Sequence, residues 1–114
     1  MPAKRLSSEL CAGAPVFAAL GDATRLRLVA RLSGGLPQSI TQLSAGAAVT
    51  RQAITKHLHV LAEAGLVRGR KHGREQMWEL NLRQVQEARR RLGLIAQQWD
   101  GALWRLKLML EEEE

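Results

Sequence analysis

Apolar residues recur along this chain at steps of three and four, the spacing that places side chains on one side of a helix. A first helix is expected from about Pro15, a residue favoured in a first turn, to Leu20. A second begins after the capping-type residue Asp22 and ends before Gly34. Its spacing predicts one apolar side: Leu26, Val29, Ala30 and Leu32. Three arginines are expected largely outside: Arg25, Arg27 and Arg31.

The middle of the chain predicts a helix, a turn and a second helix. The short helix covers about Thr41–Ala45, with Ile40 and Leu43 directed inward. Residues 46–49 turn the chain. Thr50 is a good N-cap for a longer helix that runs through Ala64, and Gly65 can end it in the left-handed conformation.

The periodicity changes after Gly65. Residues 66–71 and 74–80 surround His72-Gly73, which predicts a β-hairpin. The apolar positions of its return strand are Met77, Trp78 and Leu80. From about Arg83 to Leu110 a long helix is expected, with an apolar stripe that could pack across a two-fold axis: Leu92, Ile95, Trp99, Leu103 and Leu106.

The net charge and its distribution along the chain narrow the range of possible functions. The net charge is +6, and without the four glutamates at 111–114 it is 17 − 7 = +10. No acid lies between Asp22 and Glu63. A basic surface of this kind favours a polyanionic partner, although a merely solubilising surface is the alternative.

The helix from Thr50 to Ala64 buries a stripe of Ile54, Leu58 and Leu61. Its remaining surface offers donors and cations suited to base edges and phosphates: Thr50, Arg51, Gln52, Thr55, Lys56 and His59. The basic hairpin tip would reach the DNA backbone or the minor groove through Arg70, Lys71 and Arg74. The sequence therefore predicts a mainly α winged helix-turn-helix with a β-hairpin wing, which binds double-stranded DNA.

The 114 residues are expected to form an arm (1–13, partly ordered), a DNA-binding and dimerisation domain (14–110) and an acidic tail (111–114). Cys11 is the only cysteine, so an intramolecular disulfide is excluded. An intersubunit redox switch through Cys11 stays open. With no membrane-spanning stretch and no signal-peptide pattern, a cytoplasmic protein without a membrane partner is expected.

Other function classes fit less well. The chain lacks a Ser/His/acid or Cys/His arrangement, paired carboxylates and a phosphate-cradling glycine loop, so we do not expect an enzyme. Single-stranded RNA binding is disfavoured because the basic surface has no stacking aromatics. A winged helix used only for protein contact remains an alternative, and salt-dependent duplex binding would separate the two.

Three blocks of the sequence resemble the ArsR/SmtB-type winged-helix repressors: LGDATRLRL from Leu20, VTRQAITKHLHVLAEAGLV from Val49 and GRKHGREQMWELN from Gly69. The resemblance covers about Val16–Leu110. It implies a homodimer, held by the first and last helices, that represses its promoter and often its own gene. It also implies that five residues face the operator: Thr50, Arg51, Gln52, Thr55 and Lys56. His57 is either near the phosphates or a half-buried structural residue.

The chain departs from the metal-responsive members of that family. Thiophilic metals need two or more thiolates, and zinc sites need about four ligands. Residues 39–49, where many relatives place a cysteine pair, contain none, and the last helix has no histidine. We therefore expect no metal and no cofactor, as in the non-metal-sensing autorepressors, and the sequence identifies no inducer.

Overall fold

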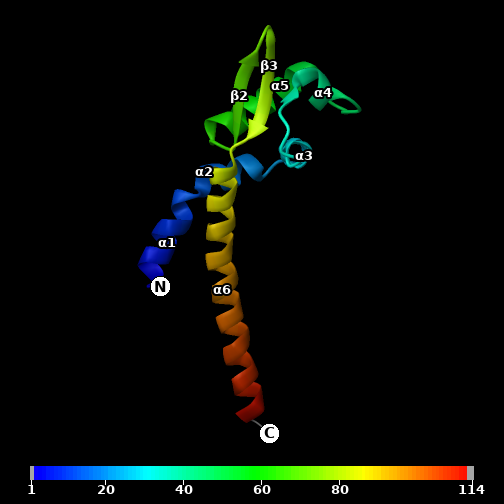
Figure 1. The fold of residues 1–114 in the computed structure, drawn as a ribbon. Helices are drawn as coiled ribbons and strands as arrows, with labels where there is room; N and C mark the ends of the chain where they lie inside the picture. Colours follow the sequence, from blue (N-terminus) through cyan, green and yellow to red (C-terminus); the bar gives the residue numbers. More distant parts are fainter. Residues whose placement is uncertain (1, 113–114) are drawn as a thin grey trace.

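Six helices and one small sheet follow one another in the computed structural model, which describes residues 2–112 (Figure 1). The helices before the wing are α1 (Ala3–Ala12), α2 (Ala14–Leu20), α3 (Ala23–Leu32), α4 (Ile40–Ser44) and α5 (Arg51–Glu63). The strands are β1 (Gln38–Ser39), β2 (Val67–His72) and β3 (Glu75–Leu80), and α6 (Leu82–Glu112) ends the described chain. The mainly α fold with a hairpin wing is as predicted. The acidic residues 113 and 114 lie outside the described residues.

The sheet has the order β1-β3-β2 and is antiparallel throughout. Strand β3 is central, and its Trp78 faces Gln38 of β1 and Gly69 of β2. Because His72 pairs with Glu75, the two-residue turn is 73–74, one position later than predicted. Gly73 has a φ of 67°, which a first turn residue of the II′ type requires and which a side chain would strain.

A single apolar core joins the helices to the sheet. Its fully buried side chains come from α3, α4, α5 and the start of the wing: Leu28, Leu32, Leu43, Ile54, Leu58, Leu61 and Leu66. Trp78 of β3 closes the core from the sheet side, with 4% of its surface exposed. The predicted buried stripe of α5 is thereby confirmed, and so is the inward position of Leu43.

The predicted buried side of α3 was partly wrong. Leu32 is buried, but Leu26 is 50% exposed and Ala30 is exposed. Leu28 takes the central position instead, with 2% of its surface exposed. Leu26 and Leu28 both stand at helical spacing from other apolar residues, so the periodicity allowed two faces. Packing against α2 and α5 selects between them.

Two elements were not predicted. Residues 3–12 form helix α1 rather than a partly ordered arm, and this helix docks on α6 through Glu9, which contacts Arg90 and Arg91. Strand β1 has only two residues, too few for a period to appear in the sequence. Its pairing with β3 makes the wing a sheet of three strands.

Helix α6 has 31 residues, which corresponds to a length of about 46 Å. It leaves the body beside α1 and α2 and continues well past them as a single rod (Figure 1). The molecule is accordingly elongated, with extents of 68 × 28 × 21 Å. No helix within residues 2–112 is long and apolar enough to cross a membrane.

Candidate nucleic-acid interface

Each of the two helices in the helix-turn-helix, α4 and α5, has a side-chain cap that fixes its start. The Ser39 hydroxyl accepts from the backbone N–H of Gln42 (3.2 Å), and the Gln42 side chain accepts from the backbone N–H of Ser39 (2.8 Å). This capping box starts α4. The predicted cap of α5 is confirmed, because the Thr50 hydroxyl accepts from the backbone N–H of Ala53 (3.1 Å). The N-terminus of α5 is therefore held in a defined direction.

The outward side of α5 carries most of the residues predicted to meet DNA. Arg51, Gln52, Lys56 and His59 are exposed, and Thr55 is half-buried. The Thr55 hydroxyl donates to the Arg51 carbonyl (2.9 Å), so it is oriented along the helix. The first acid on this helix is Glu63, at its last position. The first three turns of α5 thus offer a phosphate-compatible surface with no carboxylate.

Arg51 lies beside α4. Its guanidinium donates to the Thr41 hydroxyl (2.9 Å), and the other N–H groups of this exposed side chain make no hydrogen bond to the part of the chain that the structure describes. A guanidinium held by one neutral hydrogen bond keeps the paired donors that guanine requires.

The wing is attached to α5 through an aromatic contact. The rings of His59 and Trp78 meet edge to face, with centroids 5.6 Å apart. Because Trp78 is buried between the sheet and the helices, this contact couples the direction of the wing to that of α5. His59 therefore has a structural neighbour that the sequence did not reveal.

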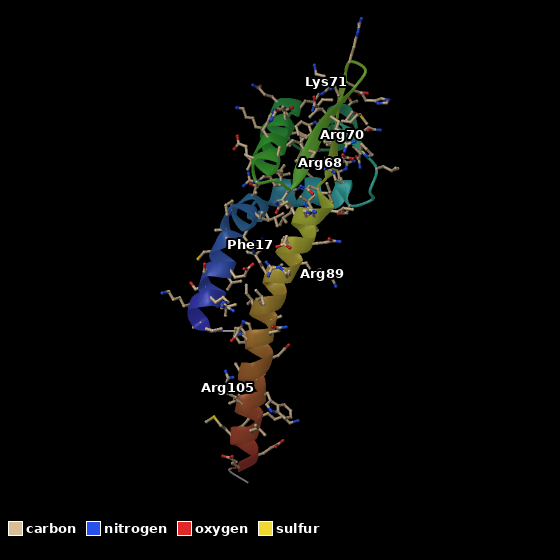
Figure 2. All side chains as sticks on the ribbon, turned by 60° about the vertical axis from the view of Figure 1, so that its left-hand side comes forward. Phe17, Arg68, Arg70, Lys71, Arg89 and Arg105 are labelled. Atoms are coloured by element: carbon tan, nitrogen blue, oxygen red, sulfur yellow. The ribbon has the colours of Figure 1, made fainter. Side chains whose placement is uncertain are left out.

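The basic residues of the wing divide into two sets. Arg70 and Arg68 share the carboxylate of Glu79, with N···O distances of 2.9 and 3.7 Å. Lys71 and Arg74 are exposed at the tip, and no ion pair of theirs occurs within residues 2–112. Figure 2 shows Arg68, Arg70 and Lys71 along the hairpin, remote from the free end of α6. The tip is thus more basic than the middle of the wing.

Two roles were predicted for His57, and its contacts fit the structural one. Its Nδ1 accepts from the guanidinium of Arg25 (3.2 Å) and lies 3.8 Å from the Asp22 carboxylate. The side chain is 25% exposed. The hydrogen bond that Asp22 accepts from the Arg25 backbone N–H, together with the nearby Arg25 charge, lowers the pKa of Asp22 below its ordinary value of 3.8. This cluster joins α5 to the N-terminus of α3.

The predicted dimerisation residues all lie exposed along α6. Ile95 is 37% exposed and Trp99 is 66% exposed. The exposed fractions of the other three residues lie between these two values: Leu92, Leu103 and Leu106. Further large apolar side chains on the same helix are exposed as well: Trp104, Leu108, Met109 and Leu110. Trp104 and Leu108 lie on another side of the helix from the predicted stripe, which a search for one stripe misses.

No group of three or more His, Cys, Asp or Glu side chains within residues 2–112 is placed to hold a metal ion. Cys11, on α1, is exposed. The interface consists instead of a capped helix with a polar outer side, followed by a basic three-stranded wing. This combination defines the class of winged helix-turn-helix proteins that bind DNA.

Comparisons with known proteins agree. Residues 20–70 match the family described as a helix-turn-helix domain. An ArsR-like transcriptional regulator from Rhodococcus sp. RHA1 is similar at 38% identity over 90% of this chain and 93% of that chain, with a TM-score of 0.70. The uncharacterized HTH-type transcriptional regulator YuzN of Bacillus subtilis (strain 168) is 36% identical over 72 residues, which cover 58% of this chain and 78% of YuzN.

The fold extends to more distant proteins. The transcriptional repressor BigR from Xylella fastidiosa is 21% identical, and the match covers 84% of this chain and 95% of that chain with a TM-score of 0.65. The chain belongs to the ArsR family of winged helix-turn-helix transcriptional regulators. It is accordingly a DNA-binding regulator, and the family to which it belongs consists of transcription factors rather than enzymes.

Proposed function

We propose that this regulator is a repressor that binds an inverted-repeat operator as a homodimer. The observation that carries the proposal is the acid-free outward side of α5, capped at Thr50, beside the exposed cations of the wing tip. The repressor mode follows from the family resemblance. A dimer bound across a promoter prevents RNA polymerase from occupying the same duplex.

In this proposal the N-terminal half of α5 enters the major groove. Arg51 and Gln52 make paired hydrogen bonds to base edges, and Thr55 contacts a base or its methyl group. Thr50 and Lys56 contact phosphates, and His59 lies at the groove wall next to the wing. The wing tip, with Lys71 and Arg74, follows the backbone into the neighbouring minor groove. Arg70 contributes less than these two because Glu79 already neutralises part of its charge.

The dimer is proposed to form through α2, which is the first helix that the sequence predicts, and α6. The exposed stripe includes Leu92, Trp99 and Leu106, each more than half exposed, and a run of large exposed apolar side chains is typical of an interaction surface. A two-fold axis through this stripe makes the contact self-complementary. The two α5 helices then enter successive major grooves about 34–36 Å apart, which requires a palindromic operator.

Selection of bound sequences from a random duplex pool tests the proposal. We expect one inverted repeat with half-sites about one helical turn apart, and a promoter carrying it should be transcribed less in vitro when the protein is added. Failure to bind any duplex, even at low ionic strength, would contradict the proposal and would favour a winged helix used for protein contact. Repeating the selection with zinc, copper, arsenite and an oxidant searches for an inducer.

A further inference from the structure

Arg31, in the last turn of α3, bonds to the C-terminal end of the short helix α4 and to strand β1, which directly precedes α4. Its guanidinium donates from one nitrogen to the carbonyl of Leu43 and to the carbonyl of Ala45, both at 2.9 Å. Its own backbone carbonyl accepts from the Gln38 side chain at 2.6 Å, and Gln38 lies in β1 just before α4. One residue of α3 therefore connects to the entrance and to the exit of α4.

The carbonyls at the end of α4 show why this contact matters. Four consecutive carbonyls, from Gln42 to Ala45, need donors where the helix ends. The backbone N–H of Ala45 satisfies Gln42, and that of Ala47 satisfies Ser44. The other two, Leu43 and Ala45, accept from Arg31. Along the four carbonyls at the end of α4, a backbone N–H and the Arg31 guanidinium thus alternate as the donor.

This turn sets the direction of α5. Only residues 45–50 separate α4 from the first residue of α5, and Gly46 occupies the left-handed region at a φ of 72°. The cap at Thr50 and the contact from Arg51 to Thr41 fix the start of α5 relative to α4. A change in the turn therefore tilts Arg51 and Gln52, the residues proposed to read bases.

We infer that Arg31 is a positioning residue for sequence-specific DNA recognition, because its two-carbonyl contact holds the helix-turn-helix turn in the conformation that presents α5. The inference rests on the proposed function. It assigns Arg31 to the recognition geometry, because both N–H groups of one guanidinium nitrogen already donate to backbone carbonyls at the turn.

Arg31→Gln and Arg27→Gln form a matched pair. Both remove one positive charge from α3, but within residues 2–112 the Arg27 side chain hydrogen-bonds only to the hydroxyl of Thr24, in its own helix. We expect Arg31→Gln to lower the ratio of operator to random-duplex affinity about tenfold, the effect of losing a charge-assisted hydrogen bond. Arg27→Gln should leave that ratio near the wild-type value. The salt dependence of operator binding should stay the same for Arg31→Gln, since a lost phosphate contact would reduce the slope by about one.

A second variant separates geometry from charge. Arg31→Lys keeps the charge but lacks the planar guanidinium, so its ratio should lie between those of the wild type and Arg31→Gln. The inference is overturned if Arg31→Lys equals the wild type, or if Arg31→Gln and Arg27→Gln lose the same specificity. Thermal melting of each variant provides the folded fraction, and affinities are expressed per folded protein.

Hydrogen exchange of the free protein keeps the inference testable without DNA. The backbone amides of residues 45–53 should exchange faster in Arg31→Gln than in Arg27→Gln, while those of the wing stay unchanged. Equal exchange in the two variants would overturn the inference. Absence of duplex binding by the wild type, with this exchange difference present, would instead refute the proposed function alone.

Discussion

Helices α5 and α6 are both amphipathic, but their apolar sides have opposite environments. In α5, Leu58 and Leu61 have 0% of their surface exposed. In α6, Trp99 is 66% exposed and Leu103 is 57% exposed. The apolar side of α5 is satisfied within the chain, so its polar side is available for a ligand. Within residues 2–112 the apolar side of α6 is left uncovered, and the proposed dimer contact would cover it. In the proposed function the same sequence pattern therefore serves recognition in one helix and assembly in the other.

The largest effect should come from the buried side of α5. Leu58→Ala removes a fully buried side chain and leaves a cavity, so the free energy of unfolding should fall by about 2–5 kcal/mol. Val60→Ala on the same helix is the control, because Val60 is 39% exposed and its truncation should cost less than about 1 kcal/mol. Urea unfolding followed by circular dichroism measures both. Equal losses would show that α5 is not anchored through this side.

A substitution on the exposed side of α6 should weaken dimerisation rather than lower the free energy of unfolding. Leu103→Asp places a carboxylate in the proposed dimer contact and should weaken dimerisation by about 3 kcal/mol, more than a hundredfold in Kd. Gln97→Asp introduces the same charge on another side of the same helix and should leave the dimer intact. Sedimentation equilibrium decides. If the Leu103→Asp protein remains a dimer at the concentrations at which the wild type is a dimer, this stripe is not the dimer contact.

The sequence predicted α5 and its surroundings almost completely, because its limits are local. Thr50 caps the first turn through its own side chain, and Gly65, at a φ of 81°, ends the helix. Helix α1 was missed because what docks it is its contact with Arg90 and Arg91, more than 80 residues away along the chain. The contacts of Arg31 and of His59 were missed for the same reason. The interface itself stays a prediction from side-chain chemistry, whereas the partners of its residues within the chain depend on tertiary packing.

The outward side of α5 should separate base reading from phosphate contact. Arg51→Ala or Gln52→Ala should cost about 1–3 kcal/mol on the selected operator and should relax the preference at one base pair. Lys56→Ala or Arg74→Ala should weaken binding to operator and random duplex alike, with a smaller salt slope. Fluorescence anisotropy at several salt concentrations measures both quantities. If all four variants lose the same affinity on both duplexes, the proposed division of roles is wrong.

Within the wing, a smaller difference is expected between neighbouring cations. Lys71→Gln should weaken duplex binding more than Arg70→Gln, because Glu79 pairs with Arg70 at 2.9 Å and screens its charge. The difference should be within about 1 kcal/mol, the range of exposed ion pairs. Glu79→Gln frees Arg70 and should remove the difference. A larger loss in Arg70→Gln would mean that Arg70 leaves Glu79 on binding DNA.

The smallest effect concerns the contact of α1 with α6 and depends on pH. The hydrogen bond from Arg90 is the main cause that lowers the pKa of Glu9 below its ordinary value of 4.5, and the charges of Arg90 and Arg91 add to it. A carboxyl whose pKa is lower in the folded protein stabilises the fold above the unfolded-state value, and this contribution is lost as the pH falls through the folded-state pKa. Glu9→Gln should therefore melt below the wild type at pH 6, and the two melting temperatures should converge below pH 4.5. Glu63→Gln, at an exposed position of α5, is the control and should show no such convergence. A constant difference between Glu9→Gln and the wild type across this range would show that the carboxylate does not hold α1 on α6, and that other contacts, such as the hydrogen bond from Arg91 to the Glu9 carbonyl (3.1 Å), keep it there.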